Sequence, residues 1–229
     1  MILPTYTLTL EPEHPLRFTM EELRSFLTRE LAEFTALHKN NPAGFVHRYP
    51  VIQSKLVRNT FRVMGISQGA SCLYQLTHGR PVLGTGENAC RITACDPAIQ
   101  SAPFGTTDIF ALYEFQTPWL ALNQQNAKKF YDLKGKPARD TFMQKLLTAQ
   151  LNTLAKSLDC TITVPISCDA KVRFRRDRID HENVMVFLGK FRTNLEIPDY
   201  LGIGQSISQG YGTINRITES PEDCTGEPE

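Results

Sequence analysis

The sequence predicts an α+β protein built from two tandem ferredoxin-like domains, each with the element order β-α-β-β-α-β. Three observations support this prediction. Apolar residues alternate with polar ones in short runs typical of strands, and elsewhere recur every three or four residues, as in helices. The same order of elements appears in both halves of the 229 residues. A glycine-rich segment, Leu201–Gly212, stands where the last helix of the second domain is expected.

In the first half, Tyr6, Leu8 and Leu10 alternate with threonines in a strand over Thr5–Leu10. A capping box at Thr19–Glu22 begins a long helix that is expected to end near His38. The further expected elements are strands over 47–57 and 61–66, a helix over Ala70–Thr77 and a strand over 81–84.

The second half repeats this order less regularly. Its expected elements are a strand over Ile109–Thr117, helices over Trp119–Leu133 and Thr141–Leu158, strands over 161–166, 171–177 and 184–191, and a last strand over Tyr211–Ile214. Prolines and a glycine between residues 90 and 105 indicate the boundary. We therefore expect domains over 1–95 and 96–218, followed by an acidic, disordered tail over 219–229.

Charge is distributed unevenly along the chain. The tail holds five acidic residues and no lysine or arginine, which leaves 25 basic and 19 acidic residues in the body of the chain. A basic body suits a polyanionic partner. No run approaches the ~20 apolar residues of a membrane span, and the N-terminus lacks the pattern of a signal peptide. We therefore expect a cytoplasmic protein with no membrane partner.

None of the six cysteines forms a CxxC pair. That spacing is typical of zinc sites and of redox motifs. We therefore expect no metal and no cofactor.

The glycine-rich segment carries the main signal for binding. Glycines allow close approach of a partner, hydroxyls accept and donate hydrogen bonds, and successive backbone N–H groups can form an anion-binding nest. Such a loop suits the phosphates of a polynucleotide, although a tight turn between strands has similar composition. The residues expected to contact RNA here are Gly202, Gly204, Gln205, Ser206, Ser208 and Gly210.

Four blocks of the sequence resemble one protein family. The glycine-rich segment resembles the C-terminal motif of the CRISPR-associated RAMP proteins, whose domains are RRM-like. Phe45–Lys55 resembles the Tyr-Pro block of the repeat-processing endoribonucleases in their b-type branch, and Leu37–Asn40 and Thr117–Gln124 are similar to that branch as well.

The resemblance implies cleavage of CRISPR repeat RNA (pre-crRNA) without a metal, by attack of a ribose 2′-OH that leaves a 2′,3′-cyclic phosphate and a 5′-OH. It points to His38 as general acid, at a helix C-terminus that favours the imidazolium. Asn40 stands where the branch usually has a second histidine. Tyr49 of the Tyr-Pro block is a candidate for positioning or deprotonating the 2′-OH. His47 lies two residues earlier, on the same face of the expected strand, and is our own candidate for the missing histidine.

The remaining candidate RNA contacts are basic. Lys55 lies further along the face of Tyr49. Lys171, Arg173 and Arg175 share one face of an expected strand, next to Arg176. A solvated sheet face is the alternative interpretation of that run.

Other readings stay open at this point. The expected partner is CRISPR repeat RNA; other CRISPR effector subunits and a second copy of the chain are further candidates. The alternatives to a nuclease are a non-catalytic scaffold that binds guide RNA and a tandem ferredoxin-like protein that binds a phosphorylated small molecule.

Overall fold

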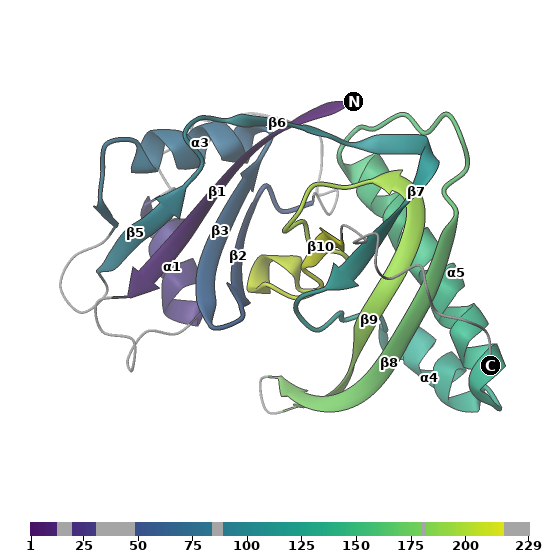
Figure 1. Cartoon of the computed structure of the whole chain (residues 1–229). Helices are drawn as coiled ribbons and strands as arrows, with labels where there is room; N and C mark the ends of the chain where they lie inside the picture. Colours follow the sequence, from purple (N-terminus) through teal and green to yellow (C-terminus); the bar gives the residue numbers. More distant parts are fainter. Residues whose placement is uncertain (13–19, 31–48, 84–88, 180–181, 218–229) are drawn as a thin grey trace, which may run out of the picture.

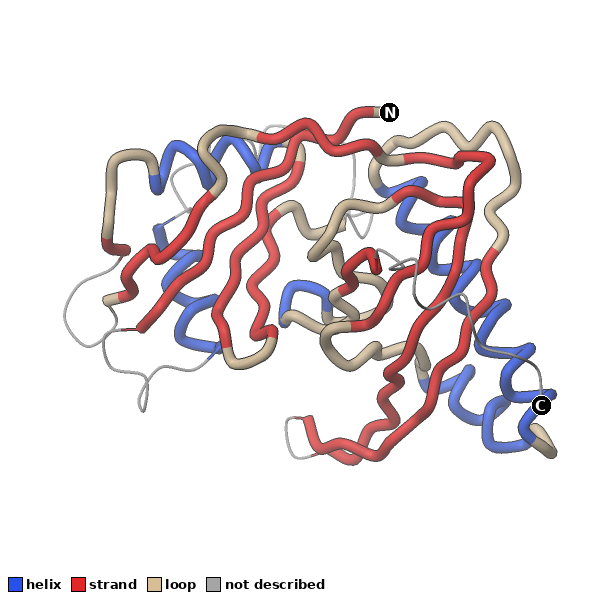
Figure 2. The backbone as a smooth tube through the Cα atoms, viewed as in Figure 1, coloured by secondary structure: helices blue, strands red, loops and turns tan. Residues whose placement is uncertain are grey.

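The computed structural model describes residues 1–12, 20–30, 49–83, 89–179 and 182–217. These residues form two antiparallel sheets that lie side by side (Figures 1 and 2), which confirms the α+β class with tandem ferredoxin-like domains. The N-terminal elements are β1 (Ile2–Pro12), α1 (Met20–Glu30), β2 (Ile52–Val57), β3 (Thr60–Ile66), α3 (Gln68–Thr77), β4 (Val82–Leu83), β5 (Cys90–Cys95) and β6 (Gln100–Pro103). The C-terminal elements are β7 (Gly105–Phe115), α4 (Gln124–Asp132), α5 (Lys136–Ser157), β8 (Cys168–Ile179), β9 (Glu182–Glu196), the short 3-10 helix η2 (Ile207–Gln209) and β10 (Ile214–Ile217).

The N-terminal sheet has the strand order β2-β3-β1-β5-β4, and β6 also pairs with β1. The expected strand over 81–84 is only the two-residue edge strand β4, and β5 takes the place beside β1 that completes the ferredoxin-like order. Strand β1 pairs with three strands: β3 lies along one edge, and on the other edge β6 pairs with the beginning of β1 and β5 with its end. Sequence analysis missed β5 and β6 because the prolines and glycine around them resemble a linker. The division at residue 95 stays a prediction.

The C-terminal sheet has the order β10-β7-β9-β8, which is the ferredoxin-like order 4-1-3-2 in chain terms. The helices α4 and α5 connect β7 to β8, and the glycine-rich segment connects β9 to β10, where the second helix of the motif is expected. The expected strand over 161–166 is wrong: β8 begins only at Cys168. The last strand lies at Ile214–Ile217 rather than at Tyr211–Ile214.

Packing explains why the first C-terminal helix is shorter than predicted. Trp119 is fully buried, its ring stacks on that of Phe115 with centroids 5.0 Å apart, and its backbone bridges to Phe187. This pairing keeps the chain extended until Asn123, whose side chain accepts a hydrogen bond from Asn126 N and caps α4. The next helix, α5, begins at Lys136, earlier than the expected Thr141, because Pro137 fits the first turn of a helix.

Two hydrophobic cores hold the domains together. The smaller core lies under α1 and α3 and includes Leu8, Leu23 and Leu73. The larger core fills the C-terminal domain and crosses the boundary, because it also includes Leu3 and Met64 of the N-terminal sheet. Since this core belongs to both domains, the glycine-rich segment meets the N-terminal sheet in a buried interface. Among the described residues, none of the helices combines the length and hydrophobicity needed to cross a bilayer.

Candidate functional site

The glycine-rich segment is a compact loop that is hydrogen-bonded to the chain around it. Ile203 N donates to Gly212 O over 2.9 Å, Gln205 N donates to Leu120 O over 3.0 Å, and Gly212 N donates to Pro118 O over 2.8 Å. These amides maintain the shape of the loop and are not available to a ligand. The predicted anion nest therefore has to rely on other groups of the segment, and its side chains Gln205, Ser206 and Ser208 are indeed exposed or half-exposed at the surface.

Buried hydrogen bonds attach this loop to the N-terminal domain. The Tyr49 hydroxyl donates to Gly202 O over 2.6 Å, and Gly202 N is 3.1 Å from both the Tyr49 hydroxyl oxygen and Gln53 Oε1. Lys55 Nζ donates to Gln53 Oε1 over 2.7 Å. All four residues are buried. We call Tyr49, Gln53, Lys55 and Gly202 the interdomain clamp.

Glycine is required where the loop meets its neighbours. Gly210 has φ +89°, and a Cβ there would lie 2.8 Å from Ser54 O of β2. Gly204 has φ +99°, and a Cβ there would lie 2.7 Å from the Trp119 indole nitrogen. An L side chain is both strained and obstructed at these two positions. Their glycines therefore serve the packing of the loop.

A cavity of about 870 Å³ lies between the loop and α5. Its polar lining consists of uncharged amides and hydroxyls, with no Lys, Arg, Asp or Glu among the described residues that line it. Gln150 is fixed there, because its amide donates to Ala121 O and accepts from the Trp119 indole. The cavity suits the polar edges and hydroxyls of a nucleotide better than it suits phosphate charge.

Burial changes the acid–base properties of two predicted site residues. Burial raises the pKa of the Tyr49 phenol far above its usual range, and its hydrogen bonds with Gln53 and Gly202 only partly oppose this. Burial also lowers the pKa of the Lys55 ammonium to about 7. As arranged here, Lys55 is fully buried and does not reach a phosphate, and Tyr49 does not readily lose its proton. Both of their RNA-directed roles stay predictions.

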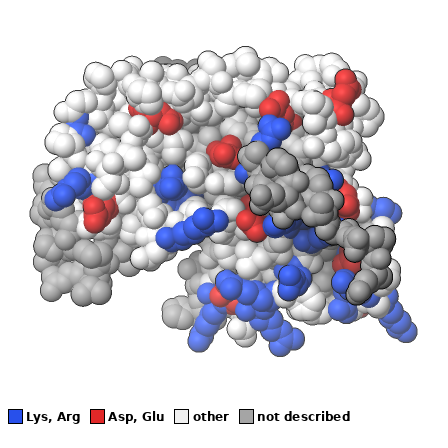
Figure 3. Space-filling model, viewed as in Figure 1, with Lys and Arg blue, Asp and Glu red and all other residues white. Residues whose placement is uncertain are grey.

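The basic face of β8 is the most strongly charged part of the candidate site. This face consists of Lys171, Arg173 and Arg175, which are exposed, as is the neighbouring Arg176, and lysines and arginines gather at this end of the molecule (Figure 3). Arg175 forms a salt bridge of 2.9 Å with Asp177, both of them largely exposed, so the pair adds little stability. The basic face thus lies on the C-terminal domain, while the described residues that line the cavity beside the loop carry no charge.

The structure also shows which site residues the sequence analysis missed. His38 and His47 lie outside the described residues. Gln53 and Gln150 were not singled out, although each joins segments far apart in the chain. Gln53 stands within the Tyr-Pro block, and the alternation of a strand places it on the same face as Tyr49 and Lys55. That shared face is the sequence pattern from which Gln53 could have been predicted.

Comparison with known proteins agrees with this geometry. The fold and the site define a class of proteins that have two ferredoxin-like domains and a glycine-rich loop between the last two strands. Models of the Cas6b N-terminal and C-terminal domains match residues 1–96 and 105–217. The chain belongs to the Cas6b family.

Solved structures share the whole architecture. A crystal structure of Cas6b is 26% identical to this chain, with a TM-score of 0.75 over 95% of this chain and 100% of that one. A second crystal structure, named CRISPR RNA processing endoribonuclease Cas6b, is 25% identical to this chain, with a TM-score of 0.72 over 95% of this chain and 100% of that one. Cas6 from Thermus thermophilus shares the fold alone: it is 13% identical, with a TM-score of 0.53 over 94% of this chain and 98% of that one. An uncharacterized Methanocaldococcus jannaschii protein is 29% identical over 122 residues, which are 51% of this chain and 79% of that protein.

The clamp predicts a loss of stability in Tyr49→Phe. This change leaves the buried Gly202 carbonyl without its phenol donor, which we expect to lower the free energy of unfolding by about 1–3 kcal/mol. Urea unfolding measures it, and Tyr131→Phe, at a tyrosine with 56% exposure, is the matched control. A loss of less than about 0.5 kcal/mol, the range of surface changes, would contradict the clamp.

The burial of Lys55 predicts that the difference in stability between the parent and Lys55→Met depends on pH. The folded-state pKa lies near 7 and the unfolded value near 10.5, so between them the unfolded chain binds more protons and stability rises with pH. Lys55→Met removes this dependence. We expect the variant to gain most relative to the parent at pH 7 and below, and the gain to shrink towards pH 10. Urea unfolding of both proteins from pH 6 to 10 checks this; a constant difference would show that Lys55 is not desolvated.

Proposed function

We propose that this chain is a metal-independent endoribonuclease that processes CRISPR repeat RNA. The ribose 2′-OH attacks the adjacent phosphorus as its proton passes to a base. The bond to the 5′ oxygen breaks as an acid protonates that oxygen. The products are a 2′,3′-cyclic phosphate and a 5′-OH, and no co-reactant is consumed.

The observation that supports the reaction most directly is the match to both Cas6b domain models, one on each half of the chain. It is joined by the full-length similarity to a Cas6b named CRISPR RNA processing endoribonuclease. The chemistry belongs to the substrate's own hydroxyl, so the protein needs proton-transfer groups and a means of positioning RNA.

We assign the general acid to His38 and favour His47 over Tyr49 as the second proton-transfer group. The phenol of Tyr49 already donates to Gly202 O and is buried, which raises its pKa. It therefore suits the role of holding the loop better than that of a base. The ordinary pKa of a histidine side chain lies near neutral pH, which suits proton transfer.

We propose that two surfaces divide the binding of RNA. The basic face of β8 contacts phosphates, which gives affinity without sequence preference. The cavity beside the glycine-rich segment, with Gln205, Ser206 and Ser208 at its edge, contacts the bases and riboses near the cut. Its uncharged lining is consistent with positioning rather than charge attraction.

Cleavage in the presence of EDTA tests the reaction. We expect the protein to cut labelled repeat RNA in EDTA, and to leave uncut the same RNA with a 2′-deoxy residue at the scissile position. His38→Ala should reduce the rate by about 10²–10⁴-fold, the usual contribution of an acid or base. His78→Ala, at an exposed histidine, is the matched control.

The opposite outcomes identify the alternatives. Tight binding of the repeat with no cleavage by the parent protein would favour the scaffold that binds guide RNA. Neither binding nor cleavage would leave the phosphorylated small molecule as the ligand. Cleavage that His38→Ala does not slow would remove His38 from the mechanism.

The basic face predicts a change in salt dependence. For single-stranded nucleic acid the slope of log K against log salt is about −0.7 per phosphate contact. Lys171→Gln with Arg175→Gln should therefore make the slope shallower by about 1.4. Arg80→Gln with Arg91→Gln, two exposed arginines of the N-terminal domain, should leave it unchanged. Equal slopes for the two double variants in filter-binding titrations would place the phosphate contacts elsewhere.

A further inference from the structure

A second cavity, of about 610 Å³, lies at the far end of the C-terminal domain from the clamp. It is enclosed by the turn between α4 and α5 together with β8. Aromatic rings form much of its wall, namely Phe130, Tyr131, Phe174 and Phe187. Phe130 contacts Phe174 and Phe187 edge to face, with ring centroids 5.8 Å and 5.6 Å apart. We call this cavity the aromatic hollow.

Two of these rings remain exposed at the surface. Tyr131 has 56% and Phe174 has 49% of its surface exposed, although both are large aromatic side chains. Sequence alternation places Phe174 on the face opposite the basic residues of β8, where it would be expected to be buried. An exposed ring beside an aromatic cavity provides a flat surface on which a partner's ring can stack.

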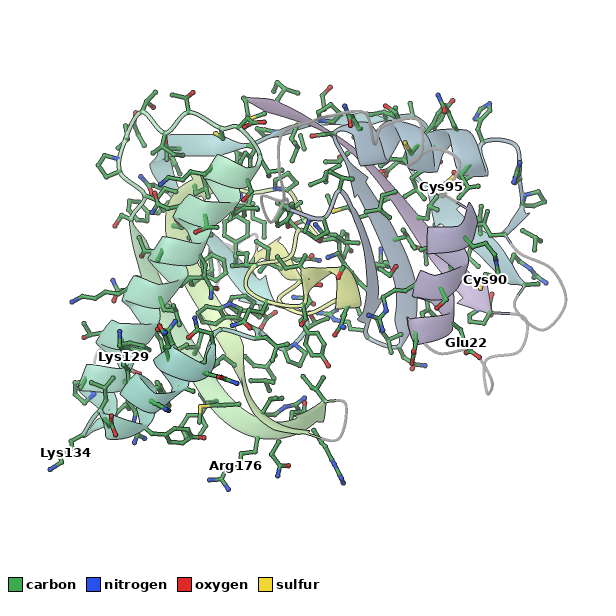
Figure 4. All side chains as sticks on the ribbon, turned by 180° about the vertical axis from the view of Figure 1, so that it is seen from behind. Glu22, Cys90, Cys95, Lys129, Lys134 and Arg176 are labelled. Carbon is green, nitrogen blue, oxygen red and sulfur yellow. The ribbon has the colours of Figure 1, made fainter. Side chains whose placement is uncertain are left out.

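Cations surround the hollow. Lys134, Lys136, Arg139 and Arg173 line it, and Asp140 is the one carboxylate among the described residues of its lining. Lys134 and Arg176 extend outwards from different elements at this end of the molecule, the turn after α4 and β8 (Figure 4). Arg139 is already fixed, because its Nε donates to Leu133 O and its guanidinium lies over the Phe130 ring, 5.3 Å from the ring centroid. Apolar rings bordered by cations match a ligand that is flat and carries negative charge.

The hollow also continues the surface proposed for RNA. Arg173 belongs both to the hollow and to the basic face of β8. Helix α5 lines both cavities: Lys136 and Met143 line the hollow, and Gln150 and Thr153 line the cavity at the loop. Along α5, residues that line one cavity or the other recur every three or four positions. They therefore lie along one side of the helix, with the two cavities about 20 Å apart at 1.5 Å per residue.

We propose that the aromatic hollow binds one unpaired nucleotide of the RNA, several positions from the cut. The base stacks on Phe174 and Tyr131, and the flanking phosphates lie against Lys134, Lys136 and Arg173. Stacking on aromatic rings tolerates every base, so this subsite anchors a single-stranded stretch rather than reading its sequence. The proposal rests on the proposed function, because it extends the same RNA from the loop to the end of the domain.

A short unpaired RNA tests the hollow. The probe is a fluorescently labelled oligoadenylate of ten nucleotides with one central 2-aminopurine. Phe174→Leu removes the ring and keeps an apolar side chain without changing charge. We expect it to weaken binding about tenfold, to reduce the stacking-induced quenching of 2-aminopurine, and to leave the salt slope unaltered. Phe110→Leu is the matched control, because Phe110 is a phenylalanine with 51% exposure outside this cavity.

A charge variant provides an independent measurement at the same place. Lys134→Gln with Lys136→Gln keeps the rings and removes two cations, so it should weaken binding and make the salt slope shallower. Parental affinity and quenching in both the ring and the charge variants would overturn the proposal. So would a loss of self-association in Phe174→Leu, measured by sedimentation, with RNA affinity unchanged, because the hollow would then be a contact between copies of the chain.

Cleavage of repeat RNA is measured on the same variants. If the parent cuts the repeat and both the ring variant and the charge variant bind the oligoadenylate normally, the hollow is refuted and the nuclease stands. If the parent neither cuts the repeat nor binds either RNA, the proposed function fails and the hollow fails with it.

Discussion

The arrangement of this molecule depends on a set of buried hydrogen bonds between its domains. Tyr49 and Gln53 meet both the carbonyl and the amide of Gly202, within a core that belongs to both sheets. A buried backbone group without a partner destabilises the fold, so these contacts fix where the loop lies. Gly210 then lets the loop approach β2 to a separation that any side chain would prevent. The cavity beside α5 follows from that placement.

The residues that hold the loop in place are different from the residues that can attract a negatively charged ligand. Residues around the loop are buried or uncharged, and the only cation in the clamp, Lys55, is kept there at an electrostatic cost that burial imposes. Exposed lysines and arginines lie instead on β8 and at the turn between α4 and α5, besides scattered ones such as Arg80 and Arg91. A long polyanion can reach both places at once, whereas a small ligand cannot. This division accounts for a protein of almost no net charge that nevertheless presents a basic end (Figure 3).

Much of the fold was predictable because it is local. Strand β1 alternates, and β8 and β9 carry β-branched and aromatic residues, so their existence follows from period two. The errors lie where tertiary contacts override local signals. Trp119 belongs to a helical pattern but stacks on Phe115 and stays extended. The strands β5 and β6 form because the edge of β1 opposite β3 is long enough to pair with both, in a stretch whose prolines resemble a linker.

The sequence by itself determined the fold class, because the spacing of apolar residues predicts the order of helices and strands and the glycine-rich segment is visible as a run of residues. It also marked Tyr49 and the basic run of β8 as places of interest. Only the tertiary structure decided what those residues touch. Burial is a property of the surroundings, and it turned a tyrosine that the sequence offers as a catalyst into the anchor of Gly202. The same is true of Phe174, which alternation places on a buried face and the fold leaves half-exposed beside a basic cavity.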